Sequence, residues 1–207
     1  MGQNIYGVDI GTSNFKMCCK DKDKIINEKN IIAIANKKDI LAFGDEAYEM
    51  YEKAPEHIEV SFPVKFGDIE NMQTLLLRFF NKMNDDKKFT GNTDFYIAVP
   101  TDVTEVEKRA FYELVADSKV KAKNIYIVDK PVADAIGAGL DVTKSKGIMI
   151  VNIGAETTEI SVLSLGGIVI SKSVKIGGNK LDDSIISAVR KVYNLIIGSK
   201  TAEGLKK

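Results

Sequence analysis

The stretch of sequence that decides the fold reads Val8-Asp9-Ile10-Gly11-Thr12-Ser13-Asn14. It has an apolar segment that ends in an aspartate, then Ile-Gly, then residues with hydroxyl or amide side chains. Apolar alternation resumes directly afterwards, which predicts a β-hairpin with Thr12, Ser13 and Asn14 at its tip. Glycine in such a tip lets the backbone approach a ligand, and successive N–H groups in a turn form a nest for an anion.

A second stretch late in the chain repeats this pattern as Val151-Asn152-Ile153-Gly154-Ala155-Glu156-Thr157. An ordinary hairpin with a glycine turn explains either stretch alone equally well. The pair together indicates two related half-structures, whose hairpins grip the phosphates of a nucleotide from both sides. An aspartate at a strand end, such as Asp9, can hold Mg²⁺ directly or through water.

The composition sets limits on the class of protein. Lysine plus arginine and aspartate plus glutamate each number 29 in 207 residues, so there is no electrostatic case for nucleic acid as a partner. No apolar run reaches the roughly 18 residues of a membrane-spanning helix, and the N-terminus lacks the pattern of an export signal. The adjacent Cys18 and Cys19, as free thiols, fit a reducing compartment. We therefore expect a cytoplasmic protein.

Strands and helices alternate along the chain, which predicts an α/β fold. Strands are expected near 4–9, 14–19, 31–36, 94–99, 124–128, 148–152, 159–163 and 168–174. Apolar spacing predicts helices at 69–83, 105–117 and 181–196, and Pro131 suits the first turn of a short fourth helix.

The first hairpin resembles the first phosphate loop of the superfamily that includes actin, heat-shock chaperones and sugar kinases. Within that superfamily the chain is similar to the MreB family of bacterial rod-shape proteins. The stretches that carry the resemblance follow in family order: Val99-Pro100, Val103 to Ala110, Pro131 with Ala135 to Leu140, Thr157-Thr158-Glu159, Ser164 to Val169, Tyr193-Asn194-Leu195, Ile197-Gly198 and Thr201-Ala202-Glu203.

The resemblance implies an actin-like (ribonuclease H-like) fold, with a complete first half and an incomplete second half. Domain I is expected at 1–140, as a core with a small outer lobe, and the start of domain II at 141–207. The family fold continues past the last residue, so the strand near 168–174 is expected to present an unpaired edge. A fragment, a shortened gene and a naturally short paralogue all fit this pattern.

The resemblance also implies ATP or ADP with Mg²⁺ as cofactors. Nucleotide contacts are implied at Asp9 (also the metal ligand), Gly11, Thr12, Ser13, Asn14, Gly154, Ala155, Glu156, Thr157, Glu203 and Lys206. The last two match the adenine or ribose side, although a frayed charged tail is the alternative. Expected partners are further copies or a full-length relative in filaments, and the wall-synthesis machinery. Weak membrane contact at the inner face is implied by the 81–92 loop with Phe89.

The chain departs from the family at positions that hydrolysis needs. The second family loop reads Asp-Ile-Gly-Gly-Gly-Thr-Thr-Glu, whereas Asn152 replaces its aspartate and Ala155 and Glu156 replace two glycines. Lys130 stands where the family has a glutamate that orients or activates the attacking water, and an ammonium cannot accept a proton. Asp134 interrupts a run that is small and apolar in the family.

These departures leave no confident catalytic residue and predict at most a weak ATPase. Drift after loss of function is one explanation. The other is a site that binds nucleotide, through Lys130 in place of a metal, without hydrolysing it. A salt bridge between Lys130 and Glu156 would reconcile two of the substitutions. An active filament ATPase and a regulatory paralogue that caps filaments of a full-length relative remain alternatives.

Overall fold

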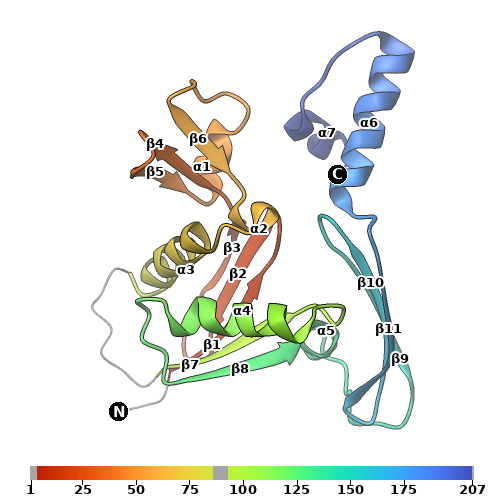
Figure 1. Cartoon of the computed structure of the whole chain (residues 1–207). Helices are drawn as coiled ribbons and strands as arrows, with labels where there is room; N and C mark the ends of the chain where they lie inside the picture. Colours follow the sequence, from red (N-terminus) through yellow and green to blue (C-terminus); the bar gives the residue numbers. More distant parts are fainter. Residues whose placement is uncertain (1–3, 86–92, 207) are drawn as a thin grey trace. The chain divides into compact units, whose positions relative to one another are not determined.

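The computed structural model describes residues 4–85 and 93–206, in two compact units, Met1–Lys130 and Pro131–Lys207 (Figure 1). The division lies ahead of the boundary expected at 140. The reason is that Val132 and Ala135 pack in one apolar cluster with Leu163 of the second unit. Phe89, the residue proposed to touch a membrane, lies outside the described residues.

The first unit is built on a five-stranded sheet with the order β3-β2-β1-β7-β8. The strands are β1 (Asn4–Ile10), β2 (Asn14–Cys19), β3 (Ile25–Lys29), β7 (Thr93–Val99) and β8 (Asn124–Asp129). β1 runs antiparallel to β2 and parallel to β7, and β7 runs parallel to β8. The carboxyl ends of β1, β7 and β8 therefore meet at one edge, the edge at which ligands bind in α/β sheets.

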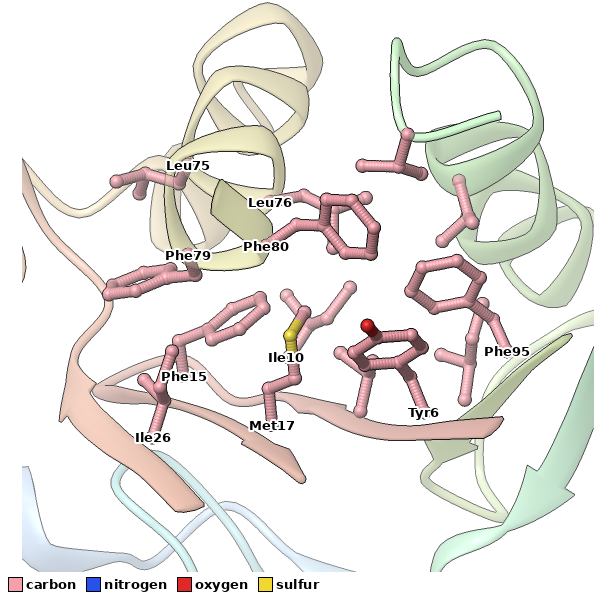
Figure 2. Close-up of a cluster of buried hydrophobic side chains, with 14 of the residues drawn as sticks. Tyr6, Ile10, Phe15, Met17, Ile26, Leu75, Leu76, Phe79, Phe80 and Phe95 are labelled. Atoms are coloured by element: carbon pink, nitrogen blue, oxygen red, sulfur yellow. The ribbon is translucent and has the colours of Figure 1, made fainter. Parts of the chain in front are cut away.

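Helices α3 (Ile69–Met83) and α4 (Glu105–Ala116) pack on this sheet over an aromatic core (Figure 2). Phe15 stacks on Phe79 with ring centroids 4.4 Å apart, and Tyr6 stacks on Phe95 at 5.4 Å. The predicted extent of α3 and the capping box of Thr104 with Glu107 are confirmed.

The first apolar residues of these two helices, Ile69 and Val106, do not face this core. Ile69 is 54% exposed and Val106 is 79% exposed. Both lie in the first turn of their helices, whereas the buried residues, such as Leu76 and Leu114, come from the later turns.

A small lobe projects from the first unit, as the family resemblance implies. It contains a three-stranded sheet of order β5-β4-β6 and two short helices, α1 (Asp45–Met50) and α2 (Pro63–Phe66). The strands are β4 (Ile32–Ala35), β5 (Asp39–Phe43) and β6 (Ile58–Ser61). A second apolar cluster around Ile31, Ala33 and Ala47 holds this lobe together.

The second unit contains a sheet of order β11-β10-β9. Its elements are β9 (Ile148–Ile153), β10 (Thr158–Ser164), β11 (Gly167–Val174), α6 (Gly178–Tyr193) and α7 (Ser199–Lys206), with most of α5 (Lys130–Gly137). Helices α6 and α7 lie beyond one end of the strands and pack on each other (Figure 1). As expected, β11 is an edge strand of this sheet. No helix among the described residues is long and apolar enough to cross a membrane.

The apolar spacing at 181–196 predicts α6 correctly, but part of its apolar face is exposed in the described part of the chain. Ile185, Ile186 and Val189 are half-buried, whereas Leu181 is 46% exposed. Val192 and Tyr193 at the end of α6, and Ile196 just beyond it, are between 68% and 85% exposed.

Candidate functional site

The first hairpin closes tightly at Gly11. The backbone N–H of Gly11 donates to the carbonyl of Asn14 at 3.0 Å, which turns β1 into β2. A Cβ at Gly11 would lie 2.7 Å from that carbonyl oxygen, so only glycine fits the turn. Thr12 and Ser13 occupy the tip and Asn14 begins β2, which confirms the predicted strand-turn-strand unit.

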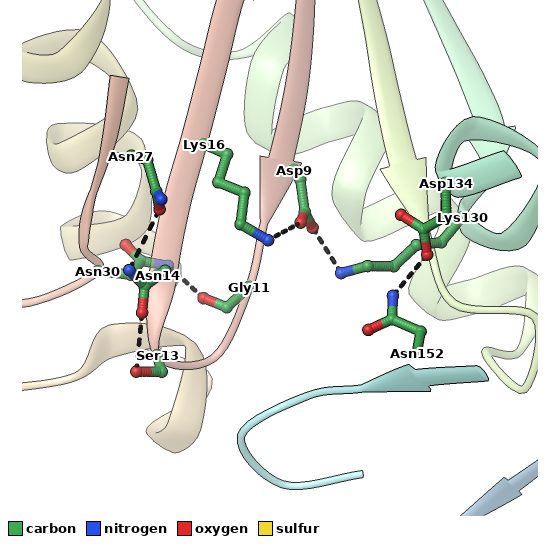
Figure 3. Close-up of polar contacts among 10 residues, drawn as sticks. All are labelled: Asp9, Gly11, Ser13, Asn14, Lys16, Asn27, Asn30, Lys130, Asp134 and Asn152. Carbon is green, nitrogen blue, oxygen red and sulfur yellow. Dashed lines mark hydrogen bonds and ion pairs between the residues drawn. The ribbon is translucent and has the colours of Figure 1, made fainter. Parts of the chain in front are cut away.

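Asn30 holds the turn of the first hairpin through two hydrogen bonds, and no sequence pattern marks it as part of the site. It is 1% exposed. Its backbone N–H donates to the carbonyl of Ser13 at 2.8 Å, and its side-chain amide donates to the carbonyl of Gly11 at 2.8 Å (Figure 3). An asparagine between two short strands reads as an ordinary turn residue, so only its contacts identify it.

Asp9 lies between two lysines (Figure 3). Lys16, its direct cross-strand neighbour on β2, contacts one carboxylate oxygen at 3.1 Å. Lys130 contacts the other at 2.7 Å from the residue that follows β8. The side chains of Asp9 and Lys130 are only 18% and 17% exposed, so their ion pair is largely shielded from water. Two ammonium groups against one carboxylate leave an excess of positive charge beside the hairpin.

This arrangement fits a divalent cation poorly. Mg²⁺ needs oxygen ligands that are free to face it, whereas both oxygens of Asp9 already accept from ammonium groups. Among residues 4–85 and 93–206, no group of three or more His, Cys, Asp or Glu side chains is placed to hold a metal. The positive charge of the Lys130 ammonium would also repel a divalent cation placed beside Asp9.

The second hairpin has the same closure as the first. The N–H of Gly154 donates to the carbonyl of Thr157 at 2.8 Å, and a Cβ at Gly154 would meet that oxygen at 3.0 Å. Each unit therefore contains a strand-turn-strand with a glycine N–H bonded three residues ahead. The repeated sequence pattern thus corresponds to a repeated structure.

The start of α6 supports the second hairpin. The N–H of Gly178 donates to the carbonyl of Gly154, and that of Asn179 to the carbonyl of Ala155, both at 2.9 Å. The Asn179 side chain donates to Glu156 at 2.7 Å. The carboxylate that replaces a family glycine is thus hydrogen-bonded at a helix N-terminus, where negative charge is stabilised.

Two of the departures from the family contact each other. The Asn152 amide donates to the Asp134 carboxylate at 2.5 Å (Figure 3). Lys130 pairs with Asp9 of the same unit. A salt bridge between Lys130 and Glu156 stays a prediction.

The C-terminal residues form a helix instead of a frayed tail. Lys206 ends α7 and makes an ion pair with the buried Asp182 of α6, with its ammonium 2.9 Å and 3.0 Å from the two carboxylate oxygens. It also donates to the carbonyl of Gly178 at 3.2 Å. Glu203 lies half-buried on the same helix. Lys206 thus connects α7 to the start of α6, and the backbone at the start of α6 is in turn hydrogen-bonded to the second hairpin.

Known proteins match the chain over almost its whole length. The family model described as MreB/Mbl protein matches residues 3–207. The cell shape-determining protein Mbl of Bacillus subtilis is 37% identical over 204 residues, which cover 97% of this chain and 60% of Mbl. The cell shape-determining protein MreB of Escherichia coli is 34% identical and covers 100% and 61%. The chain thus spans about 60% of the length of these relatives.

Solved structures agree with the sequence relatives. MreB5 of Spiroplasma citri bound to AMPPNP superposes with a TM-score of 0.90 at 32% identity, over 100% of this chain and 62% of MreB5. A MamK double helical filament superposes at 0.78 with 21% identity, over 99% of this chain and 64% of MamK, which supports the fold alone. The expected actin-like fold, present in part, is therefore confirmed, and the chain belongs to the MreB/Mbl family.

Proposed function

We propose that this chain is the nucleotide-binding part of a cytoskeletal filament protein that helps to determine cell shape. The observation that supports this best is the matching glycine closure at Gly11 and Gly154, in a chain of the MreB/Mbl family. Such turns present backbone N–H groups to the phosphates of a nucleotide. MreB5 of Spiroplasma citri, similar in sequence and fold, has been solved with ADP and with AMPPNP.

The proposed ligand is ATP or ADP, bound through Asp9, Gly11, Thr12, Ser13 and Asn14 of the first hairpin and Gly154, Ala155, Glu156 and Thr157 of the second. Glu203 and Lys206 are proposed for the adenine or ribose side. Affinity is expected to be weak for the 207 residues alone, because the family's later adenosine-binding turn is absent from them.

Hydrolysis is proposed to be slow. Lys130 occupies the position of the water-activating glutamate, and its ammonium is paired with Asp9, so it cannot accept a proton. Asn152 supplies an amide where the family has a carboxylate, and that amide is bonded to Asp134. Loss of general-base catalysis commonly costs a factor of about a hundred or more in rate.

The proposed partners are further copies of the protein or a full-length relative, in filaments at the inner face of the membrane that guide wall synthesis. A second candidate is a regulatory chain that caps or modulates such filaments. Its support is the apolar face of the second unit, where Met149, Ile153 and Ile170 are each more than 60% exposed and available for an incomplete assembly contact.

Pelleting, negative-stain microscopy and phosphate release with ATP test these roles together. The filament proposal predicts nucleotide binding and co-pelleting with full-length Mbl or MreB, with little phosphate release. A chain that lengthens no filament but shortens those of the relative would support the capping role. Phosphate release at the rate of the relative would contradict the slow-hydrolysis proposal, and the absence of any nucleotide binding would contradict the proposed site.

A further inference from the structure

We propose that nucleotide binding by this chain is independent of divalent cations, with the ammonium of Lys130 supplying the positive charge beside the first hairpin. The inference rests on the nucleotide binding proposed above and specifies how that site meets the phosphates. It is carried by the cluster of Lys16, Asp9 and Lys130, all within the first unit (Figure 3).

The backbone fixes the place of Lys130. Lys130 directly follows β8, and in the parallel register Asp129 pairs with Val99 while Asp9 pairs with Ala98 on the other side of β7. Lys130 therefore starts at the same sheet edge as Asp9 and reaches across the small Ala98. The Lys130 ammonium lies 2.7 Å from an Asp9 carboxylate oxygen. Helix α5 begins at Lys130, which limits the freedom of the Lys130 backbone.

The charge of the cluster suits a phosphate rather than a metal. Asp9 holds one ammonium on each oxygen, so a divalent cation would have to displace or compete with both lysines at these oxygens. The two lysines outnumber the single carboxylate, so the cluster attracts an anion. An ammonium carries three donor protons, and Lys130 uses one of them on Asp9. The remaining donors are available to phosphate oxygens, which lysine binds as a point charge.

The second unit shows a parallel change in its own hairpin strand. Asn152 stands where the family has a carboxylate, and its amide is bonded to Asp134. On β9 an amide therefore takes the place of a carboxylate, and on β1 both carboxylate oxygens of Asp9 accept from ammonium groups. Each change makes its strand a poorer ligand for a metal ion.

Titration calorimetry of the whole chain with ATP, in EDTA and in Mg²⁺, tests the inference directly and needs no variant. We expect the two dissociation constants to agree within about threefold. A loss of tenfold or more in EDTA would overturn metal independence while leaving the proposed nucleotide site intact. No binding in either buffer would overturn both.

Two variants then assign the effect to Lys130. Lys130→Met should weaken ATP binding in EDTA by about tenfold or more, since it removes the charge and keeps the chain length of the side chain. Lys130→Glu should bind only when Mg²⁺ is present. Lys108→Met is the matched control, because it removes a lysine of the same unit that is ion-paired with Glu105 on α4.

Thermal unfolding of each variant shows whether it is folded. If Lys130→Met is unfolded, Lys130→Gln serves in its place. It removes the charge but keeps a hydrogen-bond donor for Asp9, so it should also weaken ATP binding in EDTA by about tenfold or more. Unchanged affinity in whichever of these two variants is folded would contradict the role of Lys130.

Discussion

Asn152 and Asp134 are joined by a 2.5 Å hydrogen bond between strand β9 and helix α5. Each residue alone departs from the family pattern, and the contact makes them one change. An aspartate at 152 would place a second carboxylate against Asp134, where two negative charges 4 Å apart repel by about 4 kcal/mol at an effective dielectric constant near 20. Asparagine replaces that repulsion with a donor.

The first prediction is therefore a strong coupling between these positions. Asn152→Asp alone should destabilise the protein by about 2 kcal/mol, because the amide that donates to Asp134 is replaced by a carboxylate that repels it. In the Asp134→Ala background the same change should cost less than about 0.5 kcal/mol. A double-mutant cycle of thermal or urea unfolding measures the coupling. Additive effects of the two changes would show that the contact contributes nothing.

The second prediction concerns recovery of hydrolysis. Lys130→Glu, Asn152→Asp and Glu156→Gly restore the family residues, but Asn152→Asp also creates the clash with Asp134. We expect the quadruple variant that adds Asp134→Ala to release phosphate at least about tenfold faster than the triple variant, because catalytic groups act as a unit. Single-turnover phosphate release, with binding measured in parallel, decides this. A quadruple variant that binds ATP and stays inactive would place the defect elsewhere.

The third prediction concerns the first hairpin. Gly11→Ala puts a Cβ 2.7 Å from the Asn14 carbonyl oxygen and must open the turn. We expect a loss of tenfold or more in ATP affinity. We also expect the free energy of unfolding to fall by about 1–3 kcal/mol, which lowers the melting temperature. Gly137→Ala, at the end of α5 with no atom near the added methyl, is the control. Equal affinity of the two variants would exclude the first hairpin from binding.

The fourth prediction uses the buried tyrosine of the core. Burial raises the pKa of Tyr6 from 10.0 to about 12, although its hydrogen bond to Asn84 opposes the shift. The unfolded chain therefore loses this proton first as the pH rises. The contribution to stability is fully present below pH 10 and disappears between about pH 10 and pH 12.

Tyr6→Phe should flatten that part of the stability profile. Lys22 still donates to the Asn84 oxygen, so the variant leaves that acceptor bonded. Melting temperatures from pH 8 to pH 12, compared with those of Tyr112→Phe on the exposed side of α4, test this. Parallel profiles for Tyr6→Phe and the parent chain would rule out the proposed role of this phenol.

The fifth prediction concerns the exposed sheet face of the second unit. Five apolar residues from all three strands lie on one face of this sheet. In the strand register, Val151 is paired with Ile160, and Val162 is paired with Met149 on one side and Ile170 on the other. Much of this face is open, with Met149 66% and Ile170 62% exposed. Such an apolar area drives association, and the β11 edge adds unpaired backbone groups.

We therefore expect irregular aggregates or non-specific dimers from the 207-residue chain alone, and Val151→Lys with Ile170→Lys should reduce them severalfold in sedimentation velocity. Leu165→Lys, on the turn between β10 and β11 and 72% exposed, adds the same charge away from the face and should change little. Ordered double filaments from the isolated chain would contradict this view of the face.

The family and the main elements follow from local sequence. The Ile-Gly turns at 10–11 and 153–154 need glycine for steric reasons that act within four residues, so the sequence alone locates them. The 3.6-residue spacing locates α3 to the residue. Short elements such as β5, α1 and α7 were not predicted, because a run of four to eight residues carries little periodic signal.

Which charges meet was decided by the tertiary structure alone. Lys130 and Asp9 are 121 positions apart, and their contact depends on the parallel register of β1, β7 and β8. The sequence shows that Lys130, Asp134, Asn152 and Glu156 are unusual, but it does not indicate that Lys130 contacts Asp9 or that Asn152 contacts Asp134. Composition and spacing specify the elements through local forces, whereas ion pairs between distant residues exist only after strand pairing has brought their backbones to one sheet edge.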